Sequence, residues 1–286
     1  MNITEIIKKT RSTLIKTHTA LSGHKAGYFK VRTPGAGYDF DQLRDYQEGD
    51  DVRRIDWKST ARMQKLLVRE YRDERSRTTH ILLDCSSSMN FGTQEQKLIN
   101  VAQEVAAALL IMANGTDDAV GLHYISAGVE KSFAPRSGEK QMTRLLQQLG
   151  SAQVSEIHTS LKQALERFGN THRRRSLVFV ISDFLDEEYE TSLRILARQH
   201  EVAIMRIRDV NEMALCEAGK KITLQDSERS NMQIAEISDH DDVWSVMQRW
   251  REDQENLFKK LAIRWLDCYN NGMHVEEVVR FVKKNF

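Results

Sequence analysis

Two short apolar runs that end in aspartate constrain the fold of this chain more than any other feature. The first opens the stretch Thr78–Asn90 and reads TTHILLD up to Asp84, and the second is SLVFVISDF from Ser176 to Phe184, with Asp183 near its end. Runs of this length, rich in Ile, Val and Leu and bounded by polar residues, are typical of buried strands in a parallel sheet. The carboxyl ends of such strands are where ligands bind in open α/β sheets.

The rest of the chain alternates between helical and strand-like patterns. Apolar residues recur with helical spacing over 94–113, 140–149, 161–168 and 191–199, and short strand-like runs occupy 119–125, 131–133 and 202–207. This alternation predicts an α/β fold with a doubly wound, mainly parallel sheet. Right-handed crossovers then place Asp84 and Asp183 at the same edge of the sheet.

Both ends of the chain elaborate this unit. Residues 33–40 contain one of only two prolines and two glycines, which predicts a loop. Near the other end, 221–224 and 232–237 predict a hairpin, 243–269 a single long helix, and 275–284 a final helix. We place a boundary at Arg77, with an N-terminal segment over 1–77 and the sheet domain with its C-terminal hairpin and helices over 78–286.

Charge and cysteine content narrow the partners and the compartment. Lys plus Arg number 42 against 41 Asp plus Glu, for a formal net charge of +1. The basic stretch 53–77 is interrupted by acidic residues, so we expect intramolecular pairing there and no nucleic-acid partner, which would need an uncompensated positive field. Three cysteines without paired spacing indicate a reducing, cytoplasmic setting. No run reaches the roughly 18 to 20 apolar residues of a membrane span, and basic residues interrupt any signal peptide at the N-terminus.

The loop after the first strand is a candidate metal site. Asp84, Ser86 and Ser88 place three oxygen donors at alternate positions, and Thr159 offers a further hydroxyl where a helix begins. Hard oxygen donors suit Mg²⁺, and also Mn²⁺ or Ca²⁺. The alternative is ordinary helix capping, because Ser and Asp are preferred N-cap residues. Cys85, within the same loop, is expected to be a small buried filler and not a redox-sensitive thiol.

Two sets of residues resemble known families. Asp84-x-Ser86-x-Ser88, Thr159 and Asp183 together resemble the metal-ion-dependent adhesion site of von Willebrand factor A domains. Upstream lies a longer pattern, Arg44-x-Tyr46-x-x-Gly49-Asp50-Asp51-x-Arg53-x-Ile55-Asp56-Trp57, followed by Ala61-Arg62 and Leu67-Val68-x-Glu70. This pattern is similar to the signature of the bacterial family called domain of unknown function 58, whose members join it to a von Willebrand A-like domain.

The resemblance implies a function as well as a fold. It implies a non-enzymatic, metal-dependent protein-binding module that acts as an adaptor for a MoxR-type AAA+ ATPase or its client. In the related adhesion domains, a Glu or Asp of the partner completes the shell of the bound ion. The alternative is a metal-dependent, phosphatase-like hydrolase that uses Asp84 and Asp183. Such phosphatases need a second carboxylate two residues after the first, where this chain has Ser86, and no nucleophile elbow or Walker-type loop is present.

Overall fold

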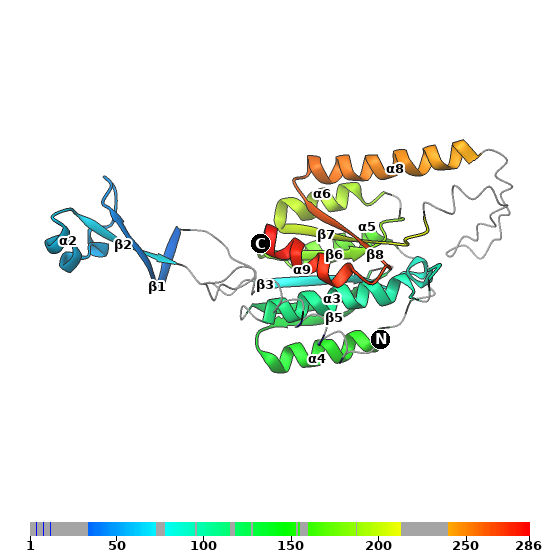
Figure 1. Cartoon of the computed structure of the whole chain (residues 1–286), viewed down its shortest axis with the longest axis horizontal. Coiled ribbons are helices and arrows are strands. Elements are labelled where there is room, and N and C mark those ends of the chain that lie inside the picture. Colours follow the sequence, from blue (N-terminus) through cyan, green and yellow to red (C-terminus); the bar gives the residue numbers. More distant parts are fainter. Residues whose placement is uncertain are drawn as a thin grey trace. The chain divides into compact units, whose positions relative to one another are not determined.

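The computed structural model describes residues 34–286 except 73–77, 95, 115–117, 127, 153, 155–159, 187 and 213–239, together with three isolated positions before residue 34 (Figure 1). The chain divides into two compact units. Thr78–Phe286 lies in the larger unit, and Lys30–Arg77 forms the smaller one. No helix among the described residues is long and apolar enough to cross a membrane.

A six-stranded sheet with the order β5-β4-β3-β6-β7-β8 forms the centre of the larger unit. Its parallel strands are β3 (Thr78–Asp84), β4 (Ala119–Ile125), β6 (Leu177–Ser182), β7 (Glu201–Arg208) and β8 (Arg264–Tyr269). The edge strand β5 (Val129–Arg136) runs antiparallel to β4. The predicted α/β fold with a mainly parallel sheet is therefore confirmed.

Helices cover both faces of this sheet (Figure 1). On one face, α3 (Leu98–Asn114), α4 (Glu139–Gly150) and α9 (His274–Asn285) pack on residues such as Ile81 and Phe179. On the other, α5 (Leu161–Thr171), α6 (Glu190–Gln199) and α8 (His240–Lys260) pack on residues such as Leu82 and Val180. Successive strand residues point to opposite faces, so each fully apolar strand supplies both cores.

The prediction of one helix over 243–269 is wrong, because the chain turns after α8 and returns as β8. Ala262 has a left-handed backbone with φ of 53°. The amide of Ile263 donates to the carbonyl of Phe258, and the amide of Ala262 donates to that of Lys259. These two bonds make a Schellman C-cap, which usually has glycine at the left-handed position. With alanine there, the sequence carries no stop signal. The predicted hairpin over 221–224 and 232–237 lies outside the described residues.

In the smaller unit, β1 (Pro34–Asp45) pairs antiparallel with β2 (Leu67–Arg72), and η1 (Val52–Arg54) and α2 (Trp57–Met63) connect them. The predicted loop over 33–40 is therefore wrong. Register shifts interrupt the β1–β2 pairing at two points, one of them between Pro34 and Asp39. Glycine is accommodated at β-bulges, and proline is tolerated at the first position of a strand. Pro34 and the two glycines after it therefore do not prevent this segment from forming a strand.

Two ion pairs join charged residues in the described part of the smaller unit, and one of them, Arg69 with Asp56, lies within the stretch 53–77 where pairing was predicted. The guanidinium of Arg44 donates to both carboxylate oxygens of Asp50, each at 2.6 Å. Hydrogen bonds from Arg44 and then from the Gln47 amide lower the pKa of Asp50 to about 2. Asp56 caps α2 and accepts a 2.9 Å bond from Arg69. Several residues of the upstream pattern therefore stabilise the local fold.

Candidate metal centre

The two central strands bring the predicted site residues to one edge of the sheet. β3 and β6 are hydrogen-bonded neighbours in parallel register, with Leu83 opposite Ile181. Asp84 is the last residue of β3 and Asp183 follows β6 directly, so both carboxyl groups lie at the same carboxyl edge. Thr159, the fifth predicted ligand, lies outside the described residues.

Asp84 is held by hydrogen bonds to both of its carboxyl oxygens. The amide of Ser86 donates to Oδ1 at 2.8 Å, and the hydroxyl of Ser182 donates to Oδ2 at 2.6 Å. The Ser182 oxygen in turn accepts from the amide of Phe184 at 3.0 Å. The sequence interpretation did not include Ser182 in the candidate site, although a hydroxyl directly before Asp183 at the end of a strand was a usable signal.

The hydroxyl groups of Ser86 and Ser88 lie 2.9 Å apart. Ser86 is the N-cap residue of η2 (Ser87–Asn90), yet its side chain makes no capping bond. The capping alternative therefore does not account for this hydroxyl. Asp183 accepts from the amide of Leu185 through Oδ1 at 3.1 Å. Its second oxygen, Oδ2, is buried and has no hydrogen-bond partner in the described part of the chain.

Two buried carboxyl groups give this edge an unfavourable concentration of negative charge. Asp84 and Asp183 are 6% and 4% exposed. Burial and then the charge of Asp183 raise the pKa of Asp84. Burial also raises the pKa of Asp183, partly offset by the Ser88 hydroxyl, the Leu185 amide and the charge of Arg208. A divalent cation would offset both effects, and the set of carboxyl and hydroxyl oxygens is the type that Mg²⁺ or Ca²⁺ takes.

The thiol beside this site is enclosed by the apolar core. Cys85 is buried among apolar residues of the core beneath α3. Burial raises the pKa of its thiol to about 12, and a protonated, enclosed thiol is a poor nucleophile. The burial of Cys85 agrees with its predicted place as a small filler.

Exposed apolar side chains follow four strands at this carboxyl edge. Phe91, Leu185, Val210 and Met273 come after β3, β6, β7 and β8, and are between 41% and 51% exposed. Exposed apolar surface of this kind marks interaction sites. Sequence reasoning missed these residues, since only the topology places them at a common edge.

The loops that carry these side chains are joined by hydrogen bonds. The carboxylate of Asp209 accepts from the Thr93 amide at 2.7 Å and from Asn270 at 2.9 Å. Asn270 also accepts from the amide of Val210 at 2.8 Å. On α8, the side chain of Gln254 donates to the Phe184 carbonyl at 2.8 Å. Hydrogen bonds therefore join the loops that carry Phe91, Val210 and Met273, and the loop that carries Leu185 is held to α8. We call these four exposed residues the apolar rim.

Comparison with known proteins gives the family. Residues 42–254 match the family described as Protein of unknown function DUF58. Uncharacterized protein Rv1480 of Mycobacterium tuberculosis is 27% identical over 254 residues, which cover 87% of this chain and 80% of that protein. Uncharacterized protein YeaD of Bacillus subtilis is 27% identical over 147 residues, 51% of this chain and 34% of that protein.

Solved structures with a similar course of the chain include BatB from Bacteroides thetaiotaomicron, with a TM-score of 0.48 and 15% identity over 73% of this chain and 98% of that one. The SpRpn10 VWA domain has a TM-score of 0.37 and 12% identity over 72% of this chain and 94% of that one. The match to the family covers most of the chain and includes the upstream pattern that first suggested it. This chain belongs to the DUF58 family.

Proposed function

We propose that this protein is a non-enzymatic protein-binding module whose contact with its partner is made through a divalent cation. One observation carries the proposal: the buried Oδ2 of Asp183, which has no hydrogen-bond partner among the described residues, lies at the sheet edge that also holds Asp84 and the paired hydroxyls of Ser86 and Ser88. An unpartnered buried carboxylate oxygen is costly. A cation bound at this edge would satisfy it through a water molecule of its coordination shell.

Each residue has a distinct role in this proposal. Ser86 and Ser88 would ligate the ion directly, with Thr159 as a further hydroxyl ligand. Both oxygens of Asp84 already accept hydrogen bonds, so Asp84 would act mainly through its charge and through coordinated water, as would Asp183. Mg²⁺ is the expected ion, with Mn²⁺ or Ca²⁺ as substitutes, because all the donors are oxygen.

The partner should offer a carboxylate surrounded by apolar residues. Neutral hydroxyl ligands leave the ion with residual positive charge. A Glu or Asp carboxylate of the partner would neutralise this charge by coordinating the ion. The rim of Phe91, Leu185, Val210 and Met273 would then exclude water around that contact, in the way that apolar surroundings support the central residues of other interfaces. We propose a MoxR-type AAA+ ATPase, or a client of that ATPase, as the partner.

Metal binding should depend on Asp84. We expect calorimetric titration with Mg²⁺ or Mn²⁺ to show weak binding, because Mg²⁺ keeps part of its water shell. Asp84→Ala should lower the affinity by about 10- to 100-fold, the usual effect of removing a group that orients metal ligands.

Ser87→Ala is the matched control for this titration. Ser87 lies in the same loop, and its hydroxyl has no hydrogen-bond partner among the described residues, so this variant should bind as the wild type does. Equal affinity in wild type and Asp84→Ala would contradict the site.

Partner binding should be lost when the ion is lost. We expect the immobilised protein to retain a MoxR-type ATPase, or another partner from the source cell lysate, in Mg²⁺ and to release it in EDTA. The double variant Ser86→Ala with Ser88→Ala should fail to retain it in either buffer. A surface ion pair is worth only about 0 to 1 kcal/mol, whereas a carboxylate that completes an ion's shell is expected to contribute more.

Leu185→Ser separates the rim from the ion in the same assay. This variant should weaken retention of the partner and leave the Mg²⁺ titration unchanged, because Leu185 contributes only its amide near Asp183. Retention that is equal in Mg²⁺, in EDTA and in the double serine variant would show that the metal is not the contact.

A further inference from the structure

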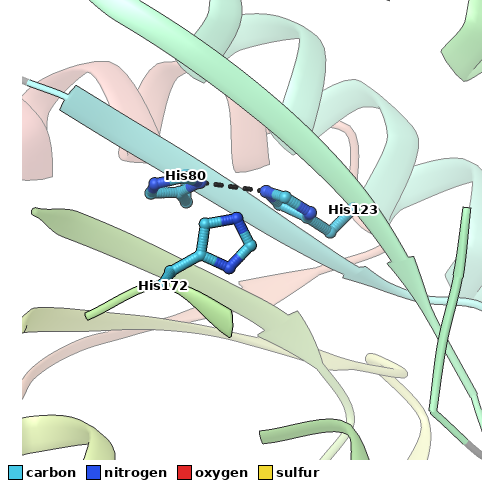
Figure 2. Close-up of side chains that lie close together, drawn as sticks. All are labelled: His80, His123 and His172. Carbon is cyan, nitrogen blue, oxygen red and sulfur yellow. Dashed lines mark hydrogen bonds between the residues drawn. The ribbon is translucent and has the colours of Figure 1, made fainter. Parts of the chain in front are cut away.

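Three histidines meet in the interior of the larger unit, away from the candidate metal centre. His80 belongs to β3, His123 to β4, and His172 directly follows α5 (Figure 2). Their facing ring nitrogens all lie within 4.8 Å of one another. His80 precedes Asp84 by four residues of an extended strand, which is about 13 Å. The histidine cluster is therefore separate from the oxygen site.

We propose that His80, His123 and His172 bind one transition-metal ion of the Zn²⁺ class. Three imidazole nitrogens are the donors of choice for Zn²⁺, and they also accept Co²⁺, Ni²⁺ or Cu²⁺. This donor set differs from the hard oxygens around Asp84, so the two sites would select different ions. The proposal is independent of the proposed function.

The sheet itself sets two of the ligands beside each other. The Nδ1 of His80 and the Nε2 of His123 lie 2.9 Å apart. The strand register pairs His80 with Gly121 on the neighbouring strand β4. Gly121 lies two residues before His123, so both positions are on the same face of the sheet. A Cβ atom at Gly121 would lie 3.2 Å from both of these nitrogens. Because Gly121 has no side chain, it does not crowd the two facing nitrogens.

The third ligand is oriented by its own backbone. The Nδ1 of His172 lies 3.2 Å from the carbonyl oxygen of Phe168. A carbonyl only accepts, so this nitrogen carries the proton and Nε2 keeps its lone pair. Figure 2 shows a nitrogen of the His172 ring pointing toward the other two rings. The Phe168 ring stacks on His172 at 4.4 Å between centroids and holds its plane.

A second oxygen supports His123 in the same way. The Ser132 hydroxyl lies 2.8 Å from Nδ1 of His123. Metal-ligating histidines usually donate the other ring N–H to an oxygen, which sets the tautomer and the ring orientation. Here His123 has the Ser132 hydroxyl and His172 has the Phe168 carbonyl in that position. Two of the three rings thus already have the outer partner that a metal ligand needs.

The cluster needs only small movements to hold an ion. With Zn–N bonds of about 2.0–2.1 Å, tetrahedral ligand nitrogens lie about 3.3 Å apart. The 2.9 Å contact must lengthen and the longer spacings must shorten. The proton between His80 and His123 moves to the other nitrogen of its ring as the ion takes its place. Burial, more than any neighbouring charge, lowers the pKa of both rings to about 3, so they are in the neutral form that binds metals.

Cobalt provides the test, because Co²⁺ held by nitrogen ligands in a tetrahedral site absorbs visible light strongly and Co²⁺ in an oxygen site does not. Untagged, EDTA-treated full-length protein should develop these bands with one equivalent of Co²⁺ and lose them when Zn²⁺ is added. His172→Gln should weaken Co²⁺ binding by tenfold or more, whereas Asp84→Ala should leave it unchanged. Absence of the bands, or equal binding by His172→Gln, overturns the proposal.

X-ray absorption on the Zn²⁺-loaded wild type identifies the ligands of the ion directly, so this test does not require that a variant fold correctly. Three nitrogen neighbours at about 2.0–2.1 Å are expected. A shell of oxygen atoms alone would overturn the assignment and would place the ion elsewhere. His123→Gln, which removes a ligand from the sheet and not from the helix end, should abolish the same signal.

Discussion

Asp267→Asn is expected to lower the free energy of unfolding by about 3 kcal/mol, because it removes the carboxylate that binds both Nε and Nη2 of a buried guanidinium and leaves only a 3.3 Å ion pair with Glu255. Arg206 on β7 has a fully buried side chain. Its Nε and Nη2 donate to the two carboxylate oxygens of Asp267 on β8, at 2.6 Å and 2.8 Å. Urea unfolding of wild type and variant, monitored by circular dichroism, measures the difference.

The same pair of strands supplies a matched control. Arg264 on β8 and Glu201 on β7 form a 3.0 Å ion pair, with side chains 45% and 31% exposed. Glu201→Gln should cost no more than about 1 kcal/mol, as surface pairs do. Replacing both members of the pair, Arg206→Met with Asp267→Leu, should recover part of the loss, because the buried guanidinium is then absent while Glu255 and Arg251 each lose one partner. Equal losses in Asp267→Asn and Glu201→Gln would contradict the argument.

The ion pair of Arg206 and Asp267 is also connected to the candidate metal centre. Arg206 donates through Nη1 to the side chain of Gln254 at 2.9 Å. Gln254 in turn holds the Phe184 carbonyl and the Tyr189 hydroxyl. The loop that follows Asp183 is therefore anchored to α8 through the residue that Arg206 contacts. Loss of the pair should loosen this loop as well as destabilise the sheet.

The strands and helices around Asp84 could be predicted because their pattern is local. The apolar runs of β3 and β6 are buried on both faces, and α3 has apolar residues on nearly its whole surface. Asp84 and Asp183 were predicted at one edge from the ends of those runs alone. In contrast, β8 was missed because the turn at Ala262 lacks glycine. Because β8 was missed, Asp267 could not be predicted as a partner of Arg206.

Features that depend on register or on topology were beyond the sequence pattern. His80 and His123 are 43 positions apart, and nothing local to either residue indicates the other. Ser182 reaches Asp84 across 98 positions, because β6 adds beside β3. The exposed rim residues are single apolar side chains in polar loops, and they share an edge only once the strand order is known. Periodicity identifies elements, but it does not identify their neighbours.

Asp84→Asn is expected to raise the free energy of unfolding of the metal-free protein at pH 8 by at most about 4 kcal/mol, because the pKa of Asp84 is raised by about three units and each unit is worth about 1.36 kcal/mol. Burial and the charge of Asp183 raise the pKa of Asp84 from 3.8 to about 7. Between these two values the folded wild type binds more protons than the unfolded chain, so its stability falls as the pH rises through that window. Asparagine carries no charge and avoids this loss.

Mg²⁺ should reverse the order of the two proteins. A cation at this edge stabilises the ionised Asp84 and Asp183, and it adds RT ln(1 + [Mg²⁺]/Kd) to the stability of the wild type. Asp84→Asn has lost one of those charges and should gain little. Urea unfolding at pH 5 and pH 8, in EDTA and in Mg²⁺, separates the effects. If Asp84→Asn is less stable than wild type at pH 8 in EDTA, the carboxyl group is held by its hydrogen bonds from Ser86 and Ser182 and does not need a cation.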